Sequence, residues 1–193
     1  MNRIILIISI LSLAVMYSCD MFTTRDPQQP QATSSNFIAA TTPEILFQNL
    51  KSSVEEKVIE NYMACFVDSS YLKRSFNFIP AGGVITQYPV LNTWSLQAER
   101  QYFNNLKTNL QQSSKITLNY SQNQLTPLGD SAIYVVDYEL TVNTSNSSIS
   151  GLYQGSSQFK IFLDSRNQWV IVDWEDIKKD NLSCWSELKG RTY

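Results

Sequence analysis

Two carboxylates in this 193-residue sequence have a type and a spacing that catalysis could use. Asp137 and Glu139 stand two residues apart in an alternating segment, so both side chains are expected on the same face of a strand. A pair of carboxylates placed in this way can serve as a general acid and a general base. The same alternation is typical of the solvated face of a half-exposed sheet, and we favour that interpretation.

The absence of histidine narrows the chemistry further. It excludes Ser-His-Asp and Cys-His catalysis and removes the commonest zinc ligand. Asp173 and Asp176 near the end of the last strand could contact a metal, but two carboxylates without partners are a weak signal for a metal site. We therefore predict no catalytic residue, no metal and no cofactor.

Aromatic residues are the remaining candidates for a binding site. Five of them are candidates for the lining of a cavity: Tyr62, Tyr120, Tyr134, Tyr138 and Trp174. The other interpretation is that the tyrosines pack in the core with their hydroxyl groups at its wet margin. Trp169 and Trp174 are expected to fill the core where a sheet curves over a helix.

The cysteines are Cys19, Cys65 and Cys184. If Cys19 is modified, an even pair remains, and an oxidising compartment would allow a Cys65–Cys184 disulfide. Two separate buried thiols are the alternative, because a sequence does not show whether two Cα atoms approach each other.

The first nineteen residues have the features of an export signal. Arg3 precedes an apolar run from Ile4 to Val15, which is too short to span a bilayer as a helix. The next residues, Met16-Tyr17-Ser18-Cys19, resemble the lipobox of bacterial lipoproteins. The resemblance implies that residues 1–18 are a cleaved signal peptide and that Cys19 carries acyl chains, which would hold the protein on a membrane.

Residues 19–41 are rich in Asp, Pro, Gln, Thr, Ser and Asn, and they predict a flexible tether between the lipid anchor and a domain. We expect the domain to lie in the cell envelope, facing the periplasm or the exterior, with the choice of inner or outer membrane open. The net charge of −2 gives no basic surface, so we expect no nucleic-acid partner.

The domain is expected to begin with two helices. Thr42 and Pro43 suit the N-cap and first position of a helix, and apolar residues then recur at every fourth position from Leu46 to Phe66. This pattern predicts a helix that ends near Asp68, with a break near Asn61. A short strand is expected around Phe76 and Phe78, and a second helix over residues 95–110.

From Lys115 onward the hydrophobic period changes from near 3.6 to 2. Four strands joined by turns are expected, over residues 115–126, 132–142, 152–163 and 168–176. Helices followed by an antiparallel meander predict an α+β domain in which the helices cover one face of the sheet.

This order of elements resembles the nuclear transport factor 2-like superfamily, which includes ketosteroid isomerases and polyketide cyclases. The segment Asn167-Gln168-Trp169-Val170-Ile171-Val172-Asp173-Trp174-Glu175-Asp176 is similar to the last strand of many members. The resemblance covers residues 42–179 and implies a curved antiparallel sheet wrapped as a cone over two helices, with a cavity at the wide end. We place this domain at residues 42–180 and expect residues 181–193 to form a tail that docks on it.

Two functions follow from these observations. We favour a non-catalytic envelope lipoprotein whose cone-like domain binds a partner protein or a small hydrophobic ligand. The alternative is an enzyme of the isomerase or cyclase type, because enzymes of this superfamily hold a carboxylate base and a Tyr or Asp donor in the cavity. A buried Asp137 with a tyrosine donor would serve that alternative.

Overall fold

A computed structural model describes residues 36–110 and 114–193. The predicted signal peptide, the lipidation site Cys19 and the tether up to residue 35 lie outside the described residues. The elements in chain order are α2 (Pro43–Glu56), α3 (Ile59–Ala64), β1 (Asn77–Ile79), α4 (Val84–Gln87), the 3₁₀ helix η1 (Pro89–Thr93), α5 (Leu96–Asn109), β2 (Lys115–Pro127), β3 (Ser131–Asn143), β4 (Gly151–Leu163), β5 (Trp169–Lys178) and α6 (Trp185–Thr192).

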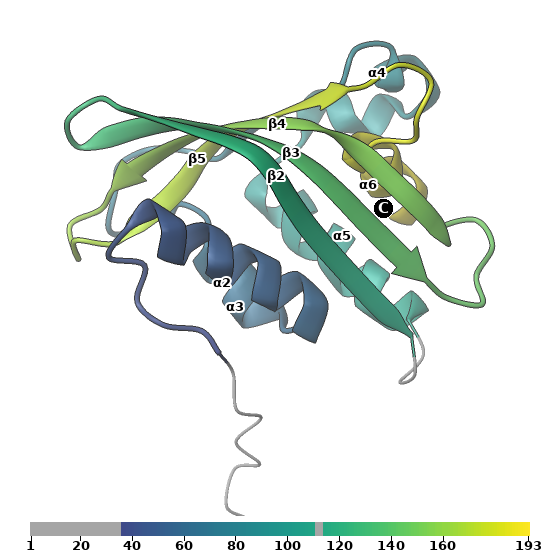
Figure 1. The fold of residues 1–193 in the computed structure, drawn as a ribbon, viewed down its shortest axis with the longest axis horizontal. Coiled ribbons are helices and arrows are strands. Elements are labelled where there is room, and N and C mark those ends of the chain that lie inside the picture. The colour runs from purple at the N-terminus through teal and green to yellow at the C-terminus, as the bar shows by residue number, and fades with distance from the viewer. Residues whose placement is uncertain (1–35, 111–113) are drawn as a thin grey trace, which may run out of the picture. The chain divides into compact units, whose positions relative to one another are not determined.

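The strands form one five-stranded sheet in the order β1-β5-β4-β3-β2. The pairs from β2 to β5 are antiparallel, as predicted, and β1 pairs with β5 in parallel. The sheet is strongly curved, and α2, α3 and α5 lie on one of its faces (Figure 1). The predicted α+β fold class is confirmed.

Local sequence signals explain the two main helices. Thr42 caps α2 by accepting a hydrogen bond from the backbone N–H of Ile45, and Ser95 caps α5 in the same way through Ala98. The first helix is shorter than predicted, because Lys57 adopts a left-handed backbone with φ of 58° and ends α2. The chain resumes as α3, so the break lies four residues before the expected one at Asn61.

Side chains alternate strictly along β3. Those at even positions from Ala132 to Val142 are buried beneath the helices, and those between them are half-buried or exposed. Tyr134 and Tyr138 therefore face the helices, whereas Asp137 and Glu139 face away from them, as the alternation predicted.

The packed part of the domain begins before residue 42, where the sequence placed its start. Trp169 donates its backbone N–H to the carbonyl of Ala40, and the side-chain amide of Asn49 donates to the carbonyl of Ile38. Ala40 is buried. Residues 38–40, which the composition assigned to the tether, therefore pack against the domain.

The segment after β5 folds back into the core. Trp185 and Leu188 of α6 are almost fully buried, and the helix contacts β4, α5 and η1. Among the described residues, no helix combines the length and the hydropathy that crossing a bilayer requires.

Candidate functional site

The aromatic residues proposed as cavity lining separate into two groups. Tyr120 and Tyr134 gather around Phe47 of α2, where the Phe47 and Tyr134 rings stack with centroids 3.8 Å apart. Tyr62, Tyr138 and Trp174 lie in the interior between the sheet, α5 and α6, and each is buried. The second group surrounds the polar groups that carry the most chemistry, and we take this interior as the candidate site.

Glu99 is the central carboxylate of the interior. It belongs to α5 and is fully buried, with 0% of its surface exposed. Tyr62 donates its hydroxyl to Oε1 of Glu99 at 2.5 Å, and the indole N–H of Trp94 donates to Oε2 at 2.5 Å. Burial raises the pKa of the Tyr62 phenol, and the neighbouring Glu99 carboxylate raises it further. Tyr62 therefore stays protonated and remains a donor.

A third donor to Glu99 comes from α6. The ammonium group of Lys189 lies 2.5 Å from Oε2 of Glu99, and both side chains have no exposed surface. Burial lowers the pKa of Lys189 to about 8, although Glu99 acts in the opposite direction. At neutral pH the pair is an ammonium and a carboxylate that offset each other's charge.

Aromatic rings enclose the same ammonium group. Its nitrogen lies 3.7 Å from the ring centroid of Trp174 and 3.8 Å from that of Phe78. Trp94 and Tyr102 follow at 5.5 Å and 5.6 Å. These distances are within the range of cation–π attraction. We call Glu99 together with Phe78, Trp94, Tyr102 and Trp174 the aromatic cage.

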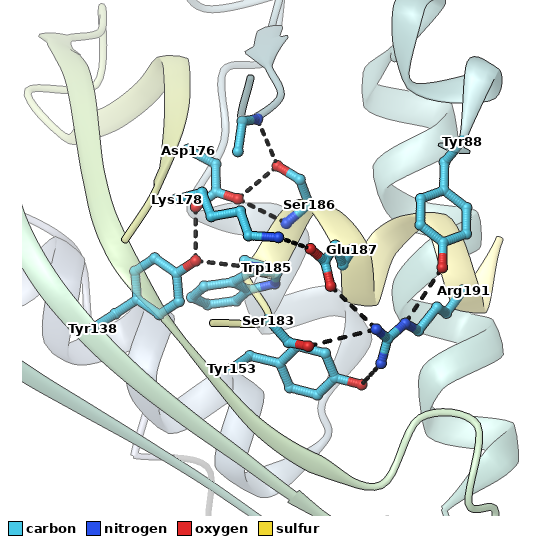
Figure 2. Close-up of polar contacts among 11 residues, drawn as sticks. Tyr88, Tyr138, Tyr153, Asp176, Lys178, Ser183, Trp185, Ser186, Glu187 and Arg191 are labelled. Carbon is cyan, nitrogen blue, oxygen red and sulfur yellow. Dashed lines mark hydrogen bonds and ion pairs between the residues drawn. The ribbon is translucent and has the colours of Figure 1, made fainter. Parts of the chain in front are cut away.

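A second buried carboxylate fixes the start of α6 (Figure 2). Asp176 accepts hydrogen bonds from the Tyr138 hydroxyl at 2.7 Å and from both the backbone N–H and the hydroxyl of Ser186. The same Tyr138 oxygen accepts the backbone N–H of Trp185 at 2.7 Å. Burial and the Asp176 charge raise the pKa of Tyr138. Asp176 is thus used to hold α6 in the interior.

The outer side of α6 is held by ion pairs, which Figure 2 also shows. Glu187 binds Lys178 at 2.5 Å and Arg191 at 3.1 Å. Arg191 also donates to the hydroxyl groups of Tyr88 and Tyr153. Further along the helix, a Cβ on Gly190 would meet Cγ of Tyr88 at 2.3 Å, so glycine is needed where this ring packs on α6.

Asp137 does not reach the interior. Its carboxylate forms an ion pair with Lys179 at 2.5 Å and accepts the Ser156 hydroxyl at 2.5 Å. Hydrogen bonds from these two side chains hold the pKa of Asp137 below its ordinary value. Glu139 is exposed on the same face. The hypothesis of a buried Asp137 acting as a base is therefore wrong, because the alternation of β3 turns that side chain away from the helices.

The remaining residues that the sequence suggested for a site have packing or hydrogen-bonding roles. Cys65 and Cys184 are two free, buried thiols, so the Cys65–Cys184 disulfide that the sequence allowed is not formed. Within the described ranges, no group of three metal-ligating side chains occurs, and Asp173 instead accepts a hydrogen bond from Asn77. The Trp174 indole donates to Ser157 at 3.1 Å, in keeping with a packed core residue.

Sequence reasoning did not identify Glu99 or Lys189, although the pattern contained a signal for both. Glu99 lies three residues after Leu96 and four before Phe103, on the apolar stripe of its helix. Lys189 lies one residue after Leu188 and four after Trp185, again on the buried stripe. A charged residue on an apolar stripe is expected to find a buried partner.

Open hollows lie on the surface, away from the interior. A groove of about 500 Å³ runs along α3 and the start of α5, with Phe66 and Leu96 in its lining and the Arg100–Glu60 ion pair beside them. Another hollow of about 380 Å³ is lined by Phe47, Tyr120 and Tyr134. The Tyr120 hydroxyl is buried without a hydrogen-bond partner.

Comparison with known proteins finds solved structures of similar fold. No protein-family model matches the chain, and no curated protein matches its sequence. Among solved structures, a protein from Streptomyces avermitilis assigned as a dehydratase of the nuclear transport factor 2-like (NTF2-like) family matches with a TM-score of 0.56 and 8% identity, over 71% of this chain and 93% of its own.

Two further structures agree with this match. The β subunit of benzoate 1,2-dioxygenase from Burkholderia mallei has a TM-score of 0.53 and 15% identity, over 70% of this chain and 87% of its own. An NTF2-like protein from Cytophaga hutchinsonii has a TM-score of 0.51 and 9% identity, over 69% and 93%. At such identities the likeness concerns the fold alone. About 70% of this chain therefore adopts the NTF2-like fold.

Proposed function

We propose that the protein is a membrane-anchored lipoprotein of the bacterial cell envelope whose NTF2-like domain is a non-catalytic binding module. The lipobox-like residues before Cys19 support the anchoring. The domain would bind a partner protein or a small ligand in the periplasm or at the cell exterior. The similar structures include a protein assigned as a dehydratase and a dioxygenase subunit, so the fold does not decide between catalysis and binding.

The observation that carries the non-catalytic role is that three donors of its own chain bind both carboxylate oxygens of the buried Glu99. A general base needs a free lone pair directed at a substrate proton. Glu99 instead accepts from Tyr62, Trp94 and Lys189.

The enzymatic alternative depends on a different residue than the sequence suggested. With Asp137 on the outer face, the acid and tyrosine that such an enzyme needs would be Glu99 and Tyr62, which are 2.5 Å apart. Both side chains are fully buried and Lys189 of α6 binds Glu99, so departure of α6 from the interior is the route by which a substrate would reach them. Whether α6 stays packed in the interior therefore distinguishes the two functions.

Amide hydrogen exchange, followed by mass spectrometry or NMR, measures how firmly α6 is packed in the interior. We expect the amides of Trp185 and Ser186, which bind Tyr138 and Asp176, to be protected to the same order as central amides of β3 such as Leu140. If these α6 amides exchange as fast as in an unfolded peptide while β3 remains protected, α6 does not fill the interior. That result would favour the enzymatic alternative.

The anchoring is tested separately in cells. The wild-type protein should fractionate with membranes and incorporate labelled palmitate, and Cys19→Ala should abolish both. Cys65→Ala is the matched control, because it removes a buried thiol of the domain and should leave labelling unchanged. An unlabelled, uncleaved wild-type chain in the soluble fraction would refute the lipoprotein assignment.

A further inference from the structure

The aromatic cage is built without α6. Phe78 lies in β1, Trp94 directly follows η1, and Trp174 lies in β5. Glu99 and Tyr102 both belong to α5. From α6, Trp185 packs on the Trp174 ring and donates to the Tyr102 hydroxyl, and Lys189 places its nitrogen at the point where the ring faces and the carboxylate converge.

The chemistry of this point favours an ammonium group. Ring faces present negative potential, and a single carboxylate supplies a full negative charge. The two closest rings, Trp174 and Phe78, are within 3.8 Å of the Lys189 nitrogen, and Glu99 is 2.5 Å away. No surface of Lys189 is exposed, so these groups replace its hydration.

A charged side chain is not needed to fill the space that Lys189 occupies. Removing an ammonium group from water costs several kcal/mol, and apolar side chains of similar size fill cores without that cost. The lowered pKa of Lys189 reflects this cost, because burial outweighs the attraction of Glu99. The carboxylate and the ring faces offset part of this cost for a cation, which they would not do for a neutral side chain of the same length.

We propose that the aromatic cage is a binding site for alkylammonium groups, which the chain fills from within with Lys189, so that α6 acts as a tethered ligand of the cone. This inference rests on the proposed binding role of the domain and adds the chemical class of its ligand. A ligand with a primary ammonium group on an aliphatic chain would enter the cage by taking the place of Lys189.

The test is chemical rescue of the full-length Lys189→Ala variant at pH 7. The substitution removes three carbons and the nitrogen, and n-propylammonium replaces those atoms. We expect n-propylammonium chloride to raise the thermal unfolding midpoint of Lys189→Ala saturably, by several degrees. If the variant is unfolded, the readout is its refolding yield from urea, which the amine should restore.

Four controls separate recognition of the charge from general effects. The neutral analogue n-propanol and an equal concentration of sodium chloride should give no comparable rescue. Lys179→Ala removes a partly exposed lysine that pairs with Asp137 and should show no saturable shift with the amine. Glu99→Gln combined with Lys189→Ala should lose the rescue, because the cage then lacks its carboxylate.

The outcome is decisive in either direction. Equal rescue by n-propanol, or no rescue of either the midpoint or the refolding yield by n-propylammonium, overturns the proposal. The membrane fractionation of Cys19→Ala is independent of the cage, so failure of the rescue leaves the proposed location of the protein intact.

Discussion

The ammonium group of Lys189 and the carboxylate of Glu99 lie 2.5 Å apart in the centre of the domain, although ninety residues separate them in the sequence. The pair joins α6 to α5 and occupies the interior that the NTF2-like sheet encloses. Glu99 also holds Tyr62 and Trp94. The consequences of this arrangement can be measured in stability, in its dependence on pH, and in the tolerance of single positions.

The packing of α6 on Tyr88 predicts an effect of Gly190→Ala. A Cβ at this position would approach the Tyr88 ring to 2.3 Å, whereas alanine in a helix is otherwise favoured over glycine by up to about 1 kcal/mol. We expect the clash to outweigh the propensity and to lower the free energy of unfolding by about 1–3 kcal/mol in urea denaturation. Gly82→Ala is the control, because a Cβ there has no atom within 4 Å. Equal stability of Gly190→Ala and wild type would mean that Tyr88 does not pack on α6.

The pKa of Lys189 predicts how stability changes with pH. In the fold this pKa is about 8, against 10.5 ordinarily, because burial outweighs Glu99 and Asp176, and Tyr102 also faces the group. Between these pH values the unfolded chain holds a proton that the folded chain has released. The free energy of unfolding of the wild type minus that of Lys189→Met should therefore rise from pH 8 to 10.5 and be smallest below pH 8. Urea denaturation of both proteins across this range gives the difference, and a constant or falling difference would contradict the assignment.

The thiol of Cys184 should act in the opposite direction. Burial, aided by the Asp176 charge, raises the pKa of Cys184 from 9.0 to about 12. The unfolded chain loses this proton near pH 9 while the folded chain keeps it, so the contribution is complete below pH 9 and declines as the pH rises toward 12. Wild type should thus lose stability faster than Cys184→Ala between pH 9 and 10.5. Parallel losses in the two proteins would show that the thiol is not held in its protonated form.

Local patterns in the sequence were sufficient for the main elements. The period of two in residues 132–142 predicted both β3 and the orientation of its faces, because one buried face fixes the register of a strand. The predicted cap at Thr42 is also confirmed, since a cap depends on residues within one turn. The solvated orientation of Asp137 and Glu139 also follows from alternation alone.

Long-range pairings were not accessible in this way. The parallel pairing of Phe78 with Trp174 joins residues far apart in the chain, and periodicity carries no information about strand partners. The small helices α4 and η1 lack an apolar stripe of sufficient length and were not predicted. Glu99 and Lys189 were missed because charged residues on short apolar stripes acquire meaning only when their partner is known.

A double-mutant cycle on Glu99 and Lys189 tests most directly whether α6 fills the interior. At pH 7, Lys189→Met leaves a buried carboxylate without its cation and Glu99→Gln leaves a buried ammonium without its anion, so each should lower the free energy of unfolding by about 3–5 kcal/mol. The double variant leaves no unpaired charge and should lose much less than the sum of the two. Losses that simply add would mean that the two side chains do not meet inside the cone.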